Sequence, residues 1–335
     1  MTDRAWVADP GIGWRILLTA RLAVPLAPAA AGSALRALCH EHDWDPAEPV
    51  VGDELTSVRA ELAAPHPAPV RVGLAGPELV VSAHHSAADG LGLLEVLSSL
   101  TGAPVSSDAR GAGRRPPGAG LARTVGRRLT EVALHPPAPV TSPSPPQPAR
   151  GDVLVEGDAP PGLRTADLVQ AAAGAVVAHQ QAVGRRARHV AIAIGVGAPA
   201  GPGDRIGDRS GLIRLRDVER LDLAAIREAV RNAPLETPPG GGRERPVLDR
   251  LATTGLRVLA PRLGSSMLVS HLGEVTADQA ERLAFHPVTA GGSGISLGAV
   301  GHRGRTTITL RARATRWSED GLQELLEAVL VRLRR

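Results

Sequence analysis

A run of prolines interrupts the sequence near its middle and limits what the chain can fold into. Seven prolines fall between Pro136 and Pro148. Because proline has a fixed φ and no backbone N–H, such a run favours an extended, semi-rigid connector over a helix or a central strand. We therefore expect an N-terminal lobe over residues 1–135, a proline-rich linker over 136–150 and a C-terminal lobe over 151–335.

The N-terminal half alternates between aliphatic runs, typical of strands, and apolar residues at helical spacing. Gly76 and Pro77 form a turn signal between two of the strands. Cys39 falls in a helical segment with no evident partner base, so we interpret it as a core residue rather than a nucleophile. The predicted strands cover residues 13–24, 68–76 and 78–84, and the predicted helices cover 29–42, 91–100 and the arginine-bearing segment 120–134.

The C-terminal half repeats this alternation, with Thr165 and Ser318 as the expected N-caps of two helices. Its last predicted strand alternates polar and aliphatic residues, as a strand with two different faces does. The predicted strands cover residues 152–157, 189–197, 211–218, 265–273, 293–300 and 306–315, and the predicted helices cover 163–184, 221–233, 247–263 and 318–333. Both halves are mixed, so the expected fold class is α/β.

The composition excludes several classes of protein. A single cysteine cannot form a disulfide within the chain. The net charge is only +4, and one Phe, four Trp and no Tyr leave almost no rings for stacking on bases, so we expect no nucleic-acid partner. The N-terminus lacks the apolar stretch of a signal peptide, and no apolar run is long enough to span a membrane. We expect a cytoplasmic protein.

One segment, residues 84–90, carries residues suited to catalysis. It reads His-His-Ser-Ala-Ala-Asp-Gly and lies between a predicted strand and a predicted helix. A neutral imidazole, here that of His85, accepts a proton at physiological pH. The helix beginning near Gly90 directs its free N–H groups toward the loop, where they favour negative charge on an attacked carbonyl oxygen. Because Gly90 has no Cβ, we also expect a substrate to approach the backbone there.

Each of these residues also has a structural interpretation. Asp89 either caps the helix or has a partner-binding role. His84 faces away from His85 on the strand, so we expect it to be packed in the core, and His85 itself could be a hydrogen-bonded residue without a catalytic role. Neighbouring strand residues diverge, so we expect no metal site.

The segment VVSAHHSAADGLGLLEVLSSLTG resembles the HHxxxDG region of the chloramphenicol acetyltransferase-like superfamily. That superfamily includes nonribosomal peptide condensation domains and wax-ester synthase-like acyltransferases. Weaker resemblances extend over LRTADLVQAAAGAVVAH, RIGDRSGLIRLR and LVSHLGEV, where His271 replaces the usual Asn. The resemblance implies two α/β lobes arranged in a V, here in a compact version, with a channel that runs to their junction.

The same resemblance implies roles for the motif residues. His85 would deprotonate an alcohol or amine, which attacks a thioester carried by coenzyme A or a carrier protein. Asp89 would be structural and would pair with an arginine, for which Arg59 and Arg71 are the nearest candidates.

The leading hypothesis is an acyltransferase or condensing enzyme, with His85 and Gly90 catalytic and His84 and Asp89 structural. We expect no bound cofactor and no metal, a thioester donor, a small-molecule acceptor, a carrier protein as partner, and a monomer. The alternatives are a carrier-binding module without catalysis and an enzyme of the same fold that catalyses cyclisation.

Overall fold

The computed structural model describes residues 14–109, 111, 135–144, 151–197, 201, 204–235, 264–289 and 294–334. Two predicted helices, over 120–134 and 247–263, lie outside these residues.

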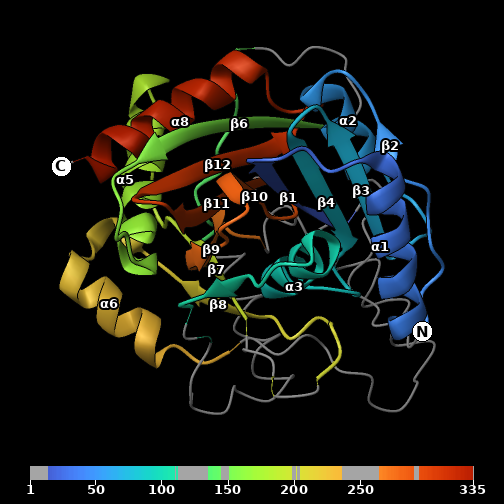
Figure 1. The fold of residues 1–335 in the computed structure, drawn as a ribbon. Coiled ribbons are helices and arrows are strands. Elements are labelled where there is room, and N and C mark those ends of the chain that lie inside the picture. Colours follow the sequence, from blue (N-terminus) through green and yellow to red (C-terminus); the bar gives the residue numbers. More distant parts are fainter. Residues whose placement is uncertain are drawn as a thin grey trace, which may run out of the picture.

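The N-terminal lobe is built on a sheet of five strands in the order β10-β1-β4-β3-β2. Neighbouring strands in this sheet are antiparallel, except that β2 and β3 are parallel. Helices α1 and α3 pack on one face of this sheet and α2 on the other, as Figure 1 shows. The elements are β1 (Arg15–Leu22), α1 (Pro28–His42), β2 (Val50–Val51), α2 (Leu55–Ala63), β3 (Val70–Ala75), β4 (Glu78–His84), α3 (Gly90–Thr101) and β10 (Ala280–His286).

Successive side chains of β1 point to opposite faces of the sheet, and both faces are covered by helices. Ile16 and Leu18 belong to the core under α1 and α3, whereas Leu17 packs with the α2 side chains. Cys39 is buried in the first of these cores, which confirms its interpretation as a packing residue. Burial, and secondarily the charge of Asp45, raises the pKa of its thiol, so the reactive thiolate is disfavoured.

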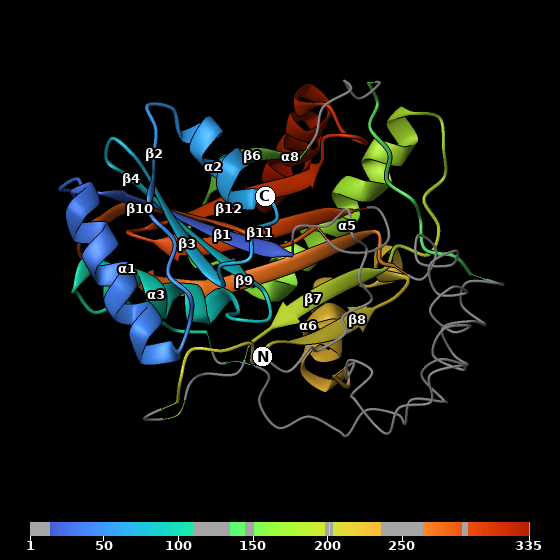
Figure 2. The ribbon, with the colours of Figure 1, turned by 90° about the vertical axis from the view of Figure 1, so that its right-hand side faces the viewer.

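The C-terminal lobe is built on a second sheet in the order β6-β12-β11-β9-β7-β8, with the short β5 paired to β9. Helices α5 and α8 pack on it and on each other. Figure 2 shows α1 and α3 at one end of the molecule and α5 and α6 toward the other, with the strands between them. The elements are β5 (Ser106–Ser107), β6 (Asp152–Ala159), α5 (Thr165–Ala182), β7 (Ile192–Val196), β8 (Gly211–Leu215), η1 (Val218–Arg220), α6 (Leu223–Asn232), β9 (Met267–Thr276), β11 (Ile295–His302), β12 (Arg305–Arg313) and α8 (Glu319–Leu333).

Two strands from the second half of the chain join the lobes. β10 is the edge strand of the first sheet, antiparallel to β1, although it follows β9 in sequence. β9 contributes Val269 to the core of the second lobe and Leu272 to the core of the first. The lobes are therefore not simply the two halves of the sequence, and the division at residues 136–150 stays a prediction.

The described part of the proline run packs on the C-terminal lobe. Ala138 and Val140 are buried in that lobe's core. The Gln180 amide donates to the Pro139 carbonyl at 2.6 Å, and the His179 ring nitrogen Nε2 lies 2.7 Å from the Thr141 carbonyl oxygen. This stretch is held against α5 by its carbonyl groups, which proline retains.

Most predicted elements within the described residues are confirmed, with one cap displaced. Ser318 caps α8, and its hydroxyl accepts the Gly321 N–H at 3.2 Å. Thr165 is the first residue of its helix rather than the cap. There the Asp167 carboxylate accepts the N–H of Arg164, the residue at the N-cap, at 2.8 Å, so a side chain inside the first turn satisfies the preceding backbone.

Candidate functional site

The backbone of the motif loop is tied to two neighbouring strands. The His84 N–H donates to the Pro69 carbonyl and the His85 N–H to the Trp14 carbonyl, each at 2.8 Å. The Ala87 N–H turns back to the His84 carbonyl at 2.8 Å. The loop therefore continues the end of β4 in a defined conformation up to the first turn of α3.

The imidazole of His85 faces a carboxylate from the other lobe. Its Nδ1 lies 3.7 Å from Oδ1 of Asp208, with 23% of the His85 side chain exposed and 2% of the Asp208 side chain. Asp208 lies in the segment 204–210 before β8, and its Oδ1 accepts the Ser210 N–H at 3.0 Å and hydroxyl at 2.5 Å. Asp208 was not identified from the sequence. Its segment RIGDRSG was noted only as a resemblance, and no spacing links it to the motif.

Asp89 caps the helix, and its second carboxylate oxygen binds a main-chain N–H of the other lobe instead of an arginine side chain. Its Oδ1 accepts the Gly92 N–H at 2.9 Å and so caps α3, while its Oδ2 accepts the main-chain N–H of Arg209 at 3.1 Å. Burial raises the pKa of Asp89, and these two backbone hydrogen bonds oppose the shift. One carboxylate thus joins the motif helix to the second lobe.

The expected arginine partners of Asp89 were wrong. Arg59 pairs with Glu156 and donates to the Thr19 hydroxyl at 3.0 Å, and Arg71 pairs with Glu61 at 2.8 Å. The reason is the sheet itself. Arg59 lies on α2, on the opposite face from α3, and Arg71 alternates with strand residues that face α1 and α3.

His84 is half-buried rather than enclosed in the core as expected. Its Nδ1 lies 2.7 Å from the Ser86 hydroxyl, within the motif loop. Burial lowers the pKa of His84, and the positive charge of Arg15 lowers it further. Arg15 is fully buried opposite His84 in the β1–β4 register.

Gly90 is explained by packing against the second half of the chain. A Cβ at this position would lie 2.6 Å from Cδ2 of Leu272 and 3.1 Å from Cζ of Phe285. The space that we expected a substrate to use on this side is therefore filled by protein. No described residue accepts a hydrogen bond from the N–H of Gly90 or Leu91, so those two donors remain at the start of α3.

This arrangement suits proton abstraction. Nδ1 of His85 lies toward a carboxylate, and a neutral imidazole that carries its proton on Nδ1 accepts a proton at Nε2. Within the described ranges, no group of three or more His, Cys, Asp or Glu side chains is placed to hold a metal ion.

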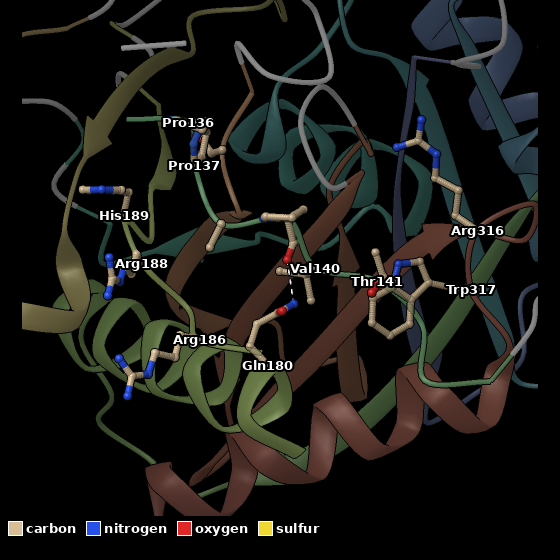
Figure 3. Close-up of a pocket in the computed structure, with 13 residues that line it drawn as sticks. Pro136, Pro137, Val140, Thr141, Gln180, Arg186, Arg188, His189, Arg316 and Trp317 are labelled. Carbon is tan, nitrogen blue, oxygen red and sulfur yellow. Dashed lines mark hydrogen bonds between the residues drawn. The ribbon is translucent and has the colours of Figure 1, made fainter. Parts of the chain in front are cut away.

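A separate hollow of about 680 Å³ lies on the C-terminal lobe, and Figure 3 shows the residues around it. It is lined by the described proline run, by Gln180 and Trp317, and by three arginines, Arg186, Arg188 and Arg316. None of its lining residues belongs to the HHxxxDG segment. His189 also lines this hollow and pairs with Asp217 at 2.6 Å. We take the motif as the candidate site because its histidine, His85, lies in the loop before a helix and faces a carboxylate of the other lobe.

None of the helices that the structure describes is long and apolar enough to cross a membrane.

Comparisons with known proteins were made by sequence and by structure. No family model and no curated protein sequence matches the chain. The structure is similar to the first condensation domain of the calcium-dependent antibiotic synthetase, with a TM-score of 0.55 and 14% identity over 97% of this chain and 92% of that one. It is also similar to a mutant starter condensation domain of rhizomide synthetase in complex with C8-CoA and Leu-SNAC, with a TM-score of 0.57 and 14% identity over 97% and 90% of the two chains.

These matches extend over nearly the whole chain and both lobes, at an identity that speaks for the fold alone. They agree with the resemblance that the HHxxxDG segment suggested. The chain has the two-lobed α/β fold of nonribosomal peptide condensation domains.

Proposed function

We propose that this protein is an acyltransferase or condensing enzyme that joins a thioester-activated acyl group to a hydroxyl or an amine. The observation that carries the proposal is the imidazole of His85. It is partly exposed, fixed by its backbone at the end of β4, and directed by Nδ1 toward a buried carboxylate. The condensation-domain fold supports this class of reaction, because its relatives include a domain solved with an acyl-coenzyme A.

In the proposed reaction, His85 accepts the proton of the acceptor hydroxyl or amine at Nε2. The acceptor oxygen or nitrogen forms a bond to the thioester carbonyl carbon, and the carbonyl oxygen becomes an oxyanion. The free N–H groups of Gly90 and Leu91, at the positive end of the α3 dipole, are the candidate donors to that oxyanion. The C–S bond then breaks, and the leaving thiolate takes the proton back from the imidazolium as a thiol.

The acyl donor is a thioester of coenzyme A or of a carrier protein, and the acceptor is a small molecule. We expect the protein to act as a monomer. Product formation is tested by mass spectrometry, with the purified full chain, a series of acyl-coenzyme A and acyl-SNAC thioesters, and hydroxyl or amine acceptors. Release of free thiol is measured in parallel.

We expect His85→Gln to lose about 10²- to 10⁴-fold in rate, as the removal of a general base does. His189→Gln is the matched control, because His189 lies on the C-terminal lobe and pairs with Asp217 at 2.6 Å. Turnover by His85→Gln at the wild-type rate rejects the proposal. A product isomeric with a single substrate, without thiol release, indicates cyclisation, and carrier binding without transfer from any thioester indicates a binding module.

A further inference from the structure

The segment that carries Asp208 is fixed to the motif helix by several independent contacts. The Arg209 N–H donates to Asp89, and the Arg209 guanidinium pairs with Glu95 of α3 at 2.8 Å. Ile206 of the same segment packs so close to Gly92 that a Cβ there would lie 3.2 Å from it. These contacts hold the segment of Asp208 beside the motif helix.

Asp208 is also oriented within its own segment. The N–H and hydroxyl of Ser210 both donate to Oδ1, the oxygen that faces the His85 ring. A carboxylate with 2% of its side chain exposed would be costly to bury without such donors. The hydrogen bonds from Ser210 therefore orient the carboxylate so that Oδ1 faces the imidazole of His85.

The charged groups around His85 come from both lobes. On its own loop lie His84 and Asp89, and across the lobe junction lies Asp208, followed in the chain by Arg209. Each carboxylate oxygen of Asp89 accepts a hydrogen bond from a main-chain N–H group, and the Arg209 guanidinium is paired with Glu95. Asp208 is thus the carboxylate placed to act on the ring of His85.

We propose that Asp208 is a positioning residue for His85, holding a proton on Nδ1 so that Nε2 is the basic nitrogen and stabilising the imidazolium once it forms. This inference rests on the proposed function, and it makes the candidate site a composite of the two lobes. The 3.7 Å separation is longer than a hydrogen bond. Contacts of this kind often tighten only when a substrate is bound.

The test uses Asp208→Asn, which keeps an oxygen that can accept from Ser210 but removes the charge. Asp204→Asn is the matched control, because Asp204 is a carboxylate of the same segment that contacts Arg209 at 3.6 Å instead of His85. The first measurement is ¹⁵N NMR of the histidine rings, with the His85 signals assigned from their loss in His85→Gln. We expect His85 to carry its proton on Nδ1 in the wild type and in Asp204→Asn, and to shift toward the Nε2–H form in Asp208→Asn.

The second measurement is the kcat of acyl transfer in the same variants. We expect Asp208→Asn to lower kcat about ten- to a hundredfold, part of what a general base contributes. If Asp208→Asn fails to fold, Ser210→Ala is used in its place. That variant keeps the charge of Asp208 but removes the hydroxyl that orients the carboxylate, so we expect a smaller shift of His85 toward the Nε2–H form.

An unchanged tautomer of His85 in Asp208→Asn, as in Asp204→Asn, overturns the inference. If the wild type transfers no acyl group from any thioester, the proposed function fails, but the NMR experiment still decides whether Asp208 sets the tautomer of His85.

Discussion

Two groups of charged side chains join the lobes, and they are built differently. In the motif junction (His85, Asp89, Asp208 and Arg209), carboxylates bind main-chain N–H groups and a hydroxyl, and the imidazole remains partly exposed. The buried ionic cluster (Arg59, Glu156, Arg282 and His286) has Glu156 of β6 at its centre. There Glu156 contacts both arginines and lies 3.3 Å from Nε2 of His286, which has no exposed surface.

The difference separates a histidine suited to structure from one suited to chemistry. Burial lowers the pKa of His286 to about 4, with the approach of Glu156 opposing the shift, so its ring is neutral in the folded protein. Burial by itself would raise the pKa of Glu156, but His286, Arg59 and Arg282 outweigh it and hold that pKa below its ordinary value. An enclosed histidine in an ionic cluster helps to fix one arrangement of the lobes, whereas a partly exposed imidazole can exchange protons with a ligand.

The largest expected effect on stability comes from breaking the buried ionic cluster. Glu156→Ala leaves two guanidinium groups without their shared carboxylate, so we expect the free energy of unfolding to fall by about 3–5 kcal/mol. Urea unfolding measures it. Asp158→Ala is the control, because Asp158 also contacts Arg282 but is about half exposed, and we expect a loss of less than about 1 kcal/mol there. Equal losses in the two variants would contradict the distinction drawn between the clusters.

The second largest effect on stability is expected from lowering the pH, which protonates groups of the buried ionic cluster. Both His286 and Glu156 have a lower pKa in the folded protein than in the unfolded chain, so the unfolded chain binds more protons. Stability is then greatest above about pH 6.5 and falls as the pH drops through about 4 for His286, and further below about 4.5 for Glu156. Urea unfolding at a series of pH values measures this dependence. His286→Gln should flatten it between pH 6.5 and 4, and a flattening of the same size in His189→Gln would show that His286 is not its source.

The motif junction should respond to a single added methyl group. Gly90→Ala places a Cβ against Leu272 and Phe285, so we expect a loss of about 1–3 kcal/mol from overpacking. The double variant Gly90→Ala with Leu272→Ala should lose less than the sum of the two single variants, because the added methyl group occupies part of the space that Leu272 leaves. Strict additivity in thermal or urea unfolding would mean that the two positions do not share that space.

The smallest expected effect on stability comes from the helix cap at the same junction. Asp89→Ala removes the acceptor for the Gly92 and Arg209 N–H groups, and the loss expected for an N-cap is about 0.5–2 kcal/mol. Asp222→Ala removes the N-cap of α6, which bonds only within its own lobe. We expect Asp89→Ala to reduce acyl transfer as well as stability, and Asp222→Ala to reduce stability alone.

Much of the local structure could be predicted from the sequence, because it depends on residues close together in the chain. The aliphatic run of β1, the helical spacing in α1 and the cap at Ser318 are of this kind. β10 was missed because its residues do not alternate. Glu281 is exposed at the sheet edge, while the four residues Leu283–His286 are all buried between β1 and the second sheet.

The sequence by itself determined most of the elements of secondary structure, the mixed α/β class and the HHxxxDG loop between a strand and a helix. Only the tertiary structure decided that Asp208 faces His85, that Arg59 pairs with Glu156 across the lobes rather than with Asp89, and that β10 pairs with β1. The physical reason is range: periodicity and capping act between near neighbours in the chain. The pairing of buried charges, in contrast, depends on which distant segments the packing of two sheets brings within a few ångströms.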